Sequence, residues 1–443
     1  MDVQQLEDAW TARVGAREAR LVAASHVPAA LSLLGIVRPG DRLVAFADDF
    51  AGAFARGFDG CDVVLVGSPS ADVFTAASEG FDASFDAEGP HLWWFVNSIG
   101  GFGLRVPDLR ALGRAAREAH ALLVVDNTVA SAFGCDPLRL GAALSLLGNV
   151  CPGDRLVVFA DDFADAFARG FDGCDVALVG SPSAEAFAAA SEGFDASFDA
   201  EGPHLWWFVN SIGGFGLRVP DLRALGRAAR EARALLVVDN TVASAFGCNP
   251  LRLGAALSLE ALDRACAGKA PHKLVAASVA RSQLKRHRVD AAAECAYALF
   301  AGCGSLALDL SAEEAAVLER GLDSLDTRMQ AHFDRARALA EYLAANEMVR
   351  NVRYPGLSSH PDHAVATGIL EHGFGPAVEF DLIERSAGEL FDALPGEFRT
   401  SPAGGATTRL SAPRGKQGST IRLFAGTDNP LIVAATLDNA LRN

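Results

Sequence analysis

Side chains that could carry chemistry are few in this chain and unevenly placed. Asp126 and Asp239 each end the apolar run ALLVVD, where a buried strand would end. His360 and His363 have a spacing that can bind a metal ion, but no cysteine cluster accompanies them, so we predict no metal site. The chain contains only four lysines that could supply an amine for covalent chemistry, Lys269, Lys273, Lys285 and Lys416.

The composition excludes several classes of function. A formal charge of −16 and a pI near 5.1 disfavour nucleic acid and anionic membranes, which bind clustered lysine and arginine. No run approaches the roughly 20 apolar residues that span a bilayer, and there is no G-x-S-x-G motif of a serine hydrolase. The eight cysteines form no C-x-x-C pair, and the first ten residues carry acids. We therefore expect a cytoplasmic globular protein whose partners are small molecules or other proteins.

A long internal repeat dominates the sequence. Residues 30–142 (copy 1) and 143–255 (copy 2) are each 113 residues long, align without a gap and differ at ten positions. The string AALSL spans the start of each copy (29–33 and 142–146) and the end of the second copy (255–259), so unequal crossing-over at this string would produce the chain. We interpret the repeat as a recent tandem duplication. A damaged or misassembled gene is the alternative, and amplifying the genomic locus across the junction tests it.

Each copy has the pattern of strands alternating with helices. The runs GDRLVAFAD, CDVVLVG, HLWWFVN and ALLVVDN are typical of strands buried on both faces of a parallel sheet. Residues 107–118 predict a helix with Pro107 in its first turn and Leu109, Leu112 and Ala116 on one stripe. This alternation predicts βαβ units with right-handed crossovers.

The chain after the repeat predicts a long helix followed by a smaller α+β segment. Ser311 and Glu314 form a capping box, and one apolar stripe continues from Leu318 to Phe333. Turn-forming residues then divide the remainder, including the Gly/Pro/Ser/Thr-rich stretch 400–418.

Two nearly identical copies compete for one sheet. If copy 1 occupies it, copy 2 is an insertion after Ala142 and Asp126 faces the site. If copy 2 occupies it, the insertion interrupts a helix that begins near Pro28, and Asp239 faces the site. The sequence leaves both arrangements open. The surplus copy would expose apolar strands unless it packs on itself or swaps with another subunit, which predicts poor solubility.

Four strings, taken together, resemble the Cys/Met-metabolism or trans-sulfuration family, which includes cystathionine γ-synthase, cystathionine γ- and β-lyase and methionine γ-lyase. They are VVDNT at 124–128, RGLDSLDTRM at 320–329, YPGLSSHP at 354–361 and IRLFAG at 421–426. The resemblance implies the α/β fold of type I pyridoxal-phosphate enzymes. That fold has a mostly parallel large-domain sheet with helices on both faces, and a small C-terminal α+β domain.

The same resemblance implies a division of the chain into five segments. They are an N-terminal helix and phosphate-turn region that lacks the family's Tyr-x-Arg arm (1–29), two large-domain copies (30–142 and 143–255), the remainder of the large domain with a long helix (256–345), and the small domain (346–443).

The resemblance also implies residues that act on the cofactor ring. In this family an aspartate of VDNT keeps the pyridine nitrogen protonated, which implies Asp126 or Asp239. A gapless run from Pro250 places the family's Schiff-base lysine on Arg264, and arginine cannot form that imine. Lys269 is the nearest replacement, although a solvated loop lysine explains it better.

Phosphate binding and ring stacking are implied less clearly. The family's phosphate-binding turn falls on Ser25, His26 and Val27, where His26 replaces a glycine that lets the backbone approach the phosphate. The tyrosine that stacks on the ring corresponds to Phe50 or Phe163, which keep the aromatic ring without the hydroxyl.

On the substrate side, Arg422 matches the family's arginine that pairs with the amino-acid carboxylate, and Ser401 is a candidate for the adjacent turn. The resemblance thus implies a homo-oligomer, dimer or tetramer, that uses pyridoxal phosphate to make or break C–S bonds in a sulfur amino acid. Arg264 motivates an alternative, a catalytically inactive relative that binds a ligand or a partner.

Overall fold

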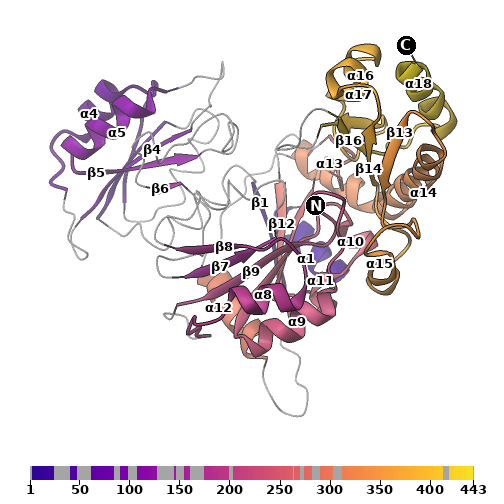
Figure 1. Cartoon of the computed structure of the whole chain (residues 1–443). Helices are drawn as coiled ribbons and strands as arrows, with labels where there is room; N and C mark the ends of the chain where they lie inside the picture. Colours follow the sequence, from indigo (N-terminus) through magenta and orange to yellow (C-terminus); the bar gives the residue numbers. More distant parts are fainter. Residues whose placement is uncertain are drawn as a thin grey trace.

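A computed structural model of the chain arranges its strands in three sheets. Figure 1 shows the five-stranded sheet of copy 1 apart from the rest, with the C-terminal domain on the opposite side of the seven-stranded sheet. The described residues are 2–23, 40–46, 61–83, 90–97, 107–126, 144–145, 154–159, 174–198, 203–262, 264–269, 274–281, 290–302, 312–412 and 419–442.

The largest sheet has seven strands and is mostly parallel, as the resemblance implies. Its order is β1 (Glu18–Ala23), β12 (Leu274–Val279), β11 (Leu257–Ala261), β10 (Ala234–Asp239), β9 (Leu205–Asn210), β7 (Arg155–Val158) and β8 (Asp175–Leu178). Strand β12 runs antiparallel to both of its neighbours, and every other neighbouring pair is parallel. Because β7, β8, β9 and β10 belong to copy 2, copy 2 occupies the large-domain sheet.

Helices cover both faces of this sheet. One face packs Leu236 and Val238 against a core that includes Trp10 and Leu225. The other face packs Trp206 against Cys295. The covering helices are α1 (Val3–Val14), α8 (Ala184–Ala190) and α9 (Leu222–Glu231) on the first face and α12 (Ala291–Gly302) on the second. Burial on both faces explains the continuous apolar runs of the strands.

Copy 1 forms a separate parallel sheet from four of its own strands, and the first residues of copy 2 add a fifth. The order is β3 (Asp62–Leu65), β2 (Arg42–Ala45), β4 (Leu92–Asn97), β5 (Ala121–Asp126) and β6 (Leu144–Ser145), with helices α4 (Ala71–Ser78) and α5 (Leu109–Glu118). Asp41 accepts hydrogen bonds from the His91 backbone N–H at 2.8 Å and from Trp93 Nε1 at 3.0 Å. Asp154 in copy 2 makes the same bonds with His204 and Trp206, at 2.7 and 2.9 Å. Both copies therefore reach the same local structure.

Two of the ten differences between the copies favour copy 2 in the large domain. Val158 is 1% exposed and fills the core around Trp206, whereas its counterpart Ala45 is smaller by two methyl groups. Asn249 Nδ2 donates to the Val14 carbonyl at 2.9 Å. The counterpart in copy 1 is Asp136, whose carboxylate cannot donate that bond. The point near Pro28 where copy 1 would then be inserted lies outside the described residues.

The helices differ from their predicted forms at two places. The helix expected at 107–118 begins at Leu109, because Asp108 accepts from the Ala111 N–H as N-cap and Pro107 precedes it. The apolar stripe after the repeat lies on two helices, α13 (Ala312–Asp323) and α14 (Leu325–Ala344), rather than one. Ser324 Oγ donates back to the Arg320 carbonyl at 2.7 Å, which competes with helical bonding at the break. The predicted Ser311 cap lies outside the described residues.

The C-terminal domain packs an antiparallel sheet against α14 and α18 (Pro430–Arg442). Its strand order is β13 (Val349–Arg353), β14 (Ala377–Leu382), β16 (Thr420–Phe424) and β15 (Arg409–Ser411). Shorter helices complete the described structure: α10 (Ser244–Gly247), α11 (Pro250–Leu253), α15 (His363–Ile369), α16 (Ala387–Ala393) and α17 (Glu397–Thr400). Among the described residues, no helix is both long and apolar enough to cross a bilayer.

Candidate functional site

The carboxyl edge of the parallel strands presents an oriented acid. Asp239 ends β10, beside Asn210 at the end of β9. Its carboxylate accepts hydrogen bonds from Asn210 Nδ2 at 3.1 Å and from the Thr241 N–H at 2.9 Å. Ligands of open α/β sheets bind outside this edge. The predicted Asp239 is therefore placed and held where an acid could meet a bound ligand.

The other predicted aspartate occupies the matching place in copy 1. Asp126 ends β5, opposite Asn97 in the register of the five-stranded sheet. That sheet does not include β11, β12 or β1, which follow β10 in the large domain. Asp239, and not Asp126, thus lies at the edge of the sheet that leads to Arg264.

A second acid at this edge, Glu260 in β11, is fully buried and was not predicted. Asn240 Nδ2 lies 3.4 Å from its Oε2, and Oε1 has no hydrogen-bond partner among the described residues. Burial raises the pKa of Glu260 to about 8. The backbone N–H of Ala245 and the charges of Arg13 and Arg264 oppose this shift. The signal in the sequence is one acid within the apolar strand LSLEA.

Arg264 lies in a buried turn and is 5% exposed. Its guanidinium carbon stands 5.1 Å from the centre of the Phe424 ring. Arg328 fixes the backbone of this turn, since it donates to the carbonyl of Arg264 at 2.7 Å and to those of Ala265 and Gly321. A Cβ on Gly404 would lie 2.9 Å from the Arg264 Cα, so the opposing loop needs glycine there. The arginine is a packed part of this site.

Lys269 is exposed, at the end of the same turn. Its backbone N–H donates to the Cys266 carbonyl at 3.0 Å, which closes the turn. This placement fits the solvated loop lysine that the sequence favoured.

Arg422 in β16 is engaged by the protein itself. Its Nε and Nη2 donate to Glu379 Oε2 at 3.1 and 2.9 Å, and Nη2 also donates to the Gly214 carbonyl at 2.9 Å. Glu379 is completely buried, and its other oxygen accepts from the Gly216 N–H at 2.9 Å. Glu379 was not predicted from the sequence, where its only signal is its place in the strand AVEFDL.

The loop around Gly216 joins the two domains. Arg218 pairs with Asp362 through two bonds of 2.6 and 2.9 Å, and His360 Nε2 lies 2.8 Å from the Gly216 carbonyl. His363 Nδ1 lies 2.8 Å from the Pro355 carbonyl. Both histidines thus contact backbone carbonyls, and the described part of the chain holds no group of three metal-binding side chains.

Of the remaining predicted residues, the structure describes only Ser401. Ser401 ends α17 as its C-cap, and its carbonyl lies 3.4 Å from Arg409 Nη1. The residues predicted for phosphate binding and ring stacking lie outside the described residues: Ser25, His26, Val27, Phe50 and Phe163.

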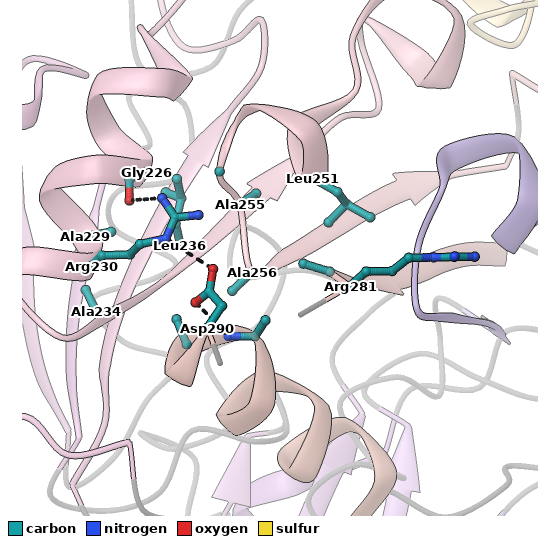
Figure 2. Close-up of a pocket in the computed structure, with 14 residues that line it drawn as sticks. Gly226, Ala229, Arg230, Ala234, Leu236, Leu251, Ala255, Ala256, Arg281 and Asp290 are labelled. Atoms are coloured by element: carbon teal, nitrogen blue, oxygen red, sulfur yellow. Dashed lines mark hydrogen bonds and ion pairs between the residues drawn. The ribbon is translucent and has the colours of Figure 1, made fainter. Parts of the chain in front are cut away.

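A small cavity lies at the opposite end of β10. Figure 2 shows Arg230 beside Asp290 there, 3.3 Å apart, with Ala234 at the start of the strand. The cavity has a volume of about 20 Å³, enough for about one water molecule. It is too small for an amino acid.

Comparisons with known proteins relate the chain to one enzyme family. A family model described as Cys/Met metabolism PLP-dependent enzyme matches residues 2–148 and 197–416. A cystathionine beta-lyase of Lactococcus lactis is 30% identical over 171 residues, which are 39% of this chain and 42% of that protein. A cystathionine gamma-synthase of Mycobacterium tuberculosis is 30% identical over 270 residues, 60% of this chain and 64% of that protein. The chain thus spans less than two thirds of the length of these relatives.

Solved structures share the fold. A methionine gamma lyase from Micromonospora echinospora has a TM-score of 0.56 at 23% identity, over 99% of this chain and 86% of that one. A cystathionine gamma-lyase from Lactobacillus plantarum has a TM-score of 0.52 at 21% identity, over 66% and 76%. With the family model matching most of its residues, the chain belongs to the Cys/Met metabolism family of pyridoxal-phosphate-dependent enzymes.

Proposed function

We propose that this chain is a non-catalytic member of the family, descended from enzymes that make or break C–S bonds in sulfur amino acids. The observation that carries the proposal is the buried, packed Arg264 at the position of the Schiff-base lysine. A guanidinium stays protonated at neutral pH and cannot attack the cofactor aldehyde. The chain therefore acts by binding a ligand in this fold.

The residues present fit only part of a pyridoxal-phosphate site. Asp239, held by Asn210 and the Thr241 N–H, suits the protonated nitrogen of a pyridine ring. Arg264 does not fit covalent attachment, and Lys269 is exposed at the end of its turn. This disagreement supports a site that has kept the family's framework without its covalent step.

The family relationship also suggests which class of ligand the chain binds and how it assembles. We infer a small sulfur-containing compound related to cystathionine, homocysteine or methionine as the ligand, and a homo-oligomer as the assembly. A cytoplasmic location fits both.

Restoring the lysine tests the proposal. Arg264→Lys, incubated with pyridoxal phosphate and reduced with borohydride, should carry a cofactor adduct on the peptide that contains residue 264. Arg227→Lys is the matched control, because it makes the same exchange on the exposed face of α9 and should gain no adduct. Absence of an adduct on a folded R264K variant would contradict the assignment of position 264.

A further inference from the structure

Glu379 is surrounded by hydrogen-bond donors from both domains. One carboxylate oxygen accepts from the Gly216 N–H at 2.9 Å, with Arg353 Nη1 at 3.5 Å. The other accepts from two nitrogens of Arg422. The Glu379 side chain is 0% exposed, against 15% for Arg422 and 19% for Arg353. The two cations thus approach a buried carboxylate from partly open positions.

Arg353 does not depend on this carboxylate. It forms a two-bond ion pair, at 3.0 and 2.7 Å, with Asp381, which lies on the same strand as Glu379. Its guanidinium also lies 4.5 Å from the centre of the Phe215 ring. Of the two cations, Arg422 is therefore the one whose charge Glu379 balances.

A buried carboxylate in this strand has a cost. Burial raises the pKa of Glu379, and the nearby charges of Arg422 and Arg353 only partly oppose that shift. An apolar side chain would serve the core of β14 without this cost. What Glu379 adds is a carboxylate on Arg422, which is also the ligand that an amino acid would bring to a guanidinium.

We propose that Glu379 is an internal competitor that closes Arg422 to external carboxylates, so that the site selects against free amino acids and favours ligands in which the carboxylate is absent or blocked. This inference rests on the proposed function, because it takes Arg422 to face the ligand site. A free amino acid must displace Glu379 and leave it buried beside only Gly216 and Arg353. An amide or ester of the same amino acid does not need Arg422.

Replacing the competitor tests this selection. Glu379→Ser removes the carboxylate and leaves space beside Arg422. We expect it to bind L-methionine at least about tenfold more tightly than the wild-type chain, measured by isothermal titration calorimetry. Binding of L-methioninamide should change by less than about twofold. Adding Arg422→Lys to E379S should remove the gain.

Asp381→Ser is the matched control. It removes another acid from β14 and loosens the same sheet, but it frees Arg353 and not Arg422, so it should not gain methionine binding. If E379S does not fold, Glu379→Gln replaces it in the same binding measurement, because glutamine keeps the shape of the side chain and removes its charge. Equal methionine affinity in the wild-type chain and the folded variant would overturn the inference.

The two proposals can fail separately. A trapped adduct on R264K together with no gain in E379S would reject the role of Glu379 and keep the assignment of position 264. A gain in E379S together with a specific cofactor adduct on the wild-type chain would reject the non-catalytic proposal alone.

Discussion

Two acids at the carboxyl edge of the large sheet have opposite environments. Asp239 accepts hydrogen bonds from two donors and is partly open to solvent. Glu260 is enclosed, and one of its oxygens has no partner among the described residues. Neighbouring strands of one sheet thus place Asp239 where a ligand could reach it and bury Glu260, which favours its neutral form.

The raised pKa of Glu260 predicts a pH-dependent stability. Because its folded pKa of about 8 exceeds the unfolded value, its contribution is complete below the unfolded pKa and is lost as pH rises through about 8. Between about pH 5 and pH 9, the free energy of unfolding should therefore fall more in the wild-type chain than in Glu260→Gln, by on the order of a few kcal/mol. Urea denaturation at both pH values measures this, and equal falls would contradict it.

His204 also makes the free energy of unfolding fall as pH rises, equally in the wild-type chain and in E260Q. Its pKa is raised to about 10, mainly by the Asp154 carboxylate 3.6 Å from its Nδ1, so its contribution to stability is also lost as pH rises. The comparison with E260Q cancels this slope, because His204 is present in both chains.

At the scale of the elements, apolar patterning predicted the strands well and the helix ends less well. The run ALLVVD forms a strand in both copies because each is buried. The break at Ser324 was not predictable from the stripe, because a continuous stripe fits two helices as well as one. The acids Glu260 and Glu379 were missed because their partners come from segments far away in the sequence.

Asn249, at the start of α11, allows a test of why copy 2 and not copy 1 completes the large domain. Asn249 caps this helix through Oδ1 and holds the Val14 carbonyl through Nδ2. Asn249→Asp keeps an oxygen for the cap but loses the donor, and should lower the free energy of unfolding by about 1–3 kcal/mol. Asn249→Ala loses both bonds and should cost more. Thermal denaturation compares them, and an N249D protein as stable as the wild type would show that this bond does not favour copy 2.

At the scale of the whole molecule, the chain contains one sheet unit twice in different surroundings. The sequence could not decide which copy completes the large domain, because nearly all of their residues agree. The structure decides through contacts with α1, β11 and β12, where Val158 and Asn249 differ from copy 1. Because the two units have separate hydrophobic cores, we expect them to unfold independently.

The same substitution in each copy tests that independence. Leu112 and Leu225 are counterparts, 0% and 1% exposed in separate cores, so either change to alanine should cost about 2–5 kcal/mol in its own unit. Hydrogen exchange followed by mass spectrometry can separate them, because peptides that begin at His120 or Arg233 differ in mass. L112A should speed exchange only in the first peptide and L225A only in the second. Faster exchange in both peptides from one change would show that the units unfold together.

We propose that this member of the family does not hold its cofactor covalently. The most direct test is borohydride reduction of the wild-type chain with pyridoxal phosphate, followed by peptide mapping of all four lysines. We predict no specific adduct, because the family resemblance places the Schiff-base lysine on Arg264 and because Lys269 is exposed. A stoichiometric adduct on Lys269, with release of a 2-oxo acid from cystathionine or methionine, would show an active enzyme and overturn the proposed non-catalytic role.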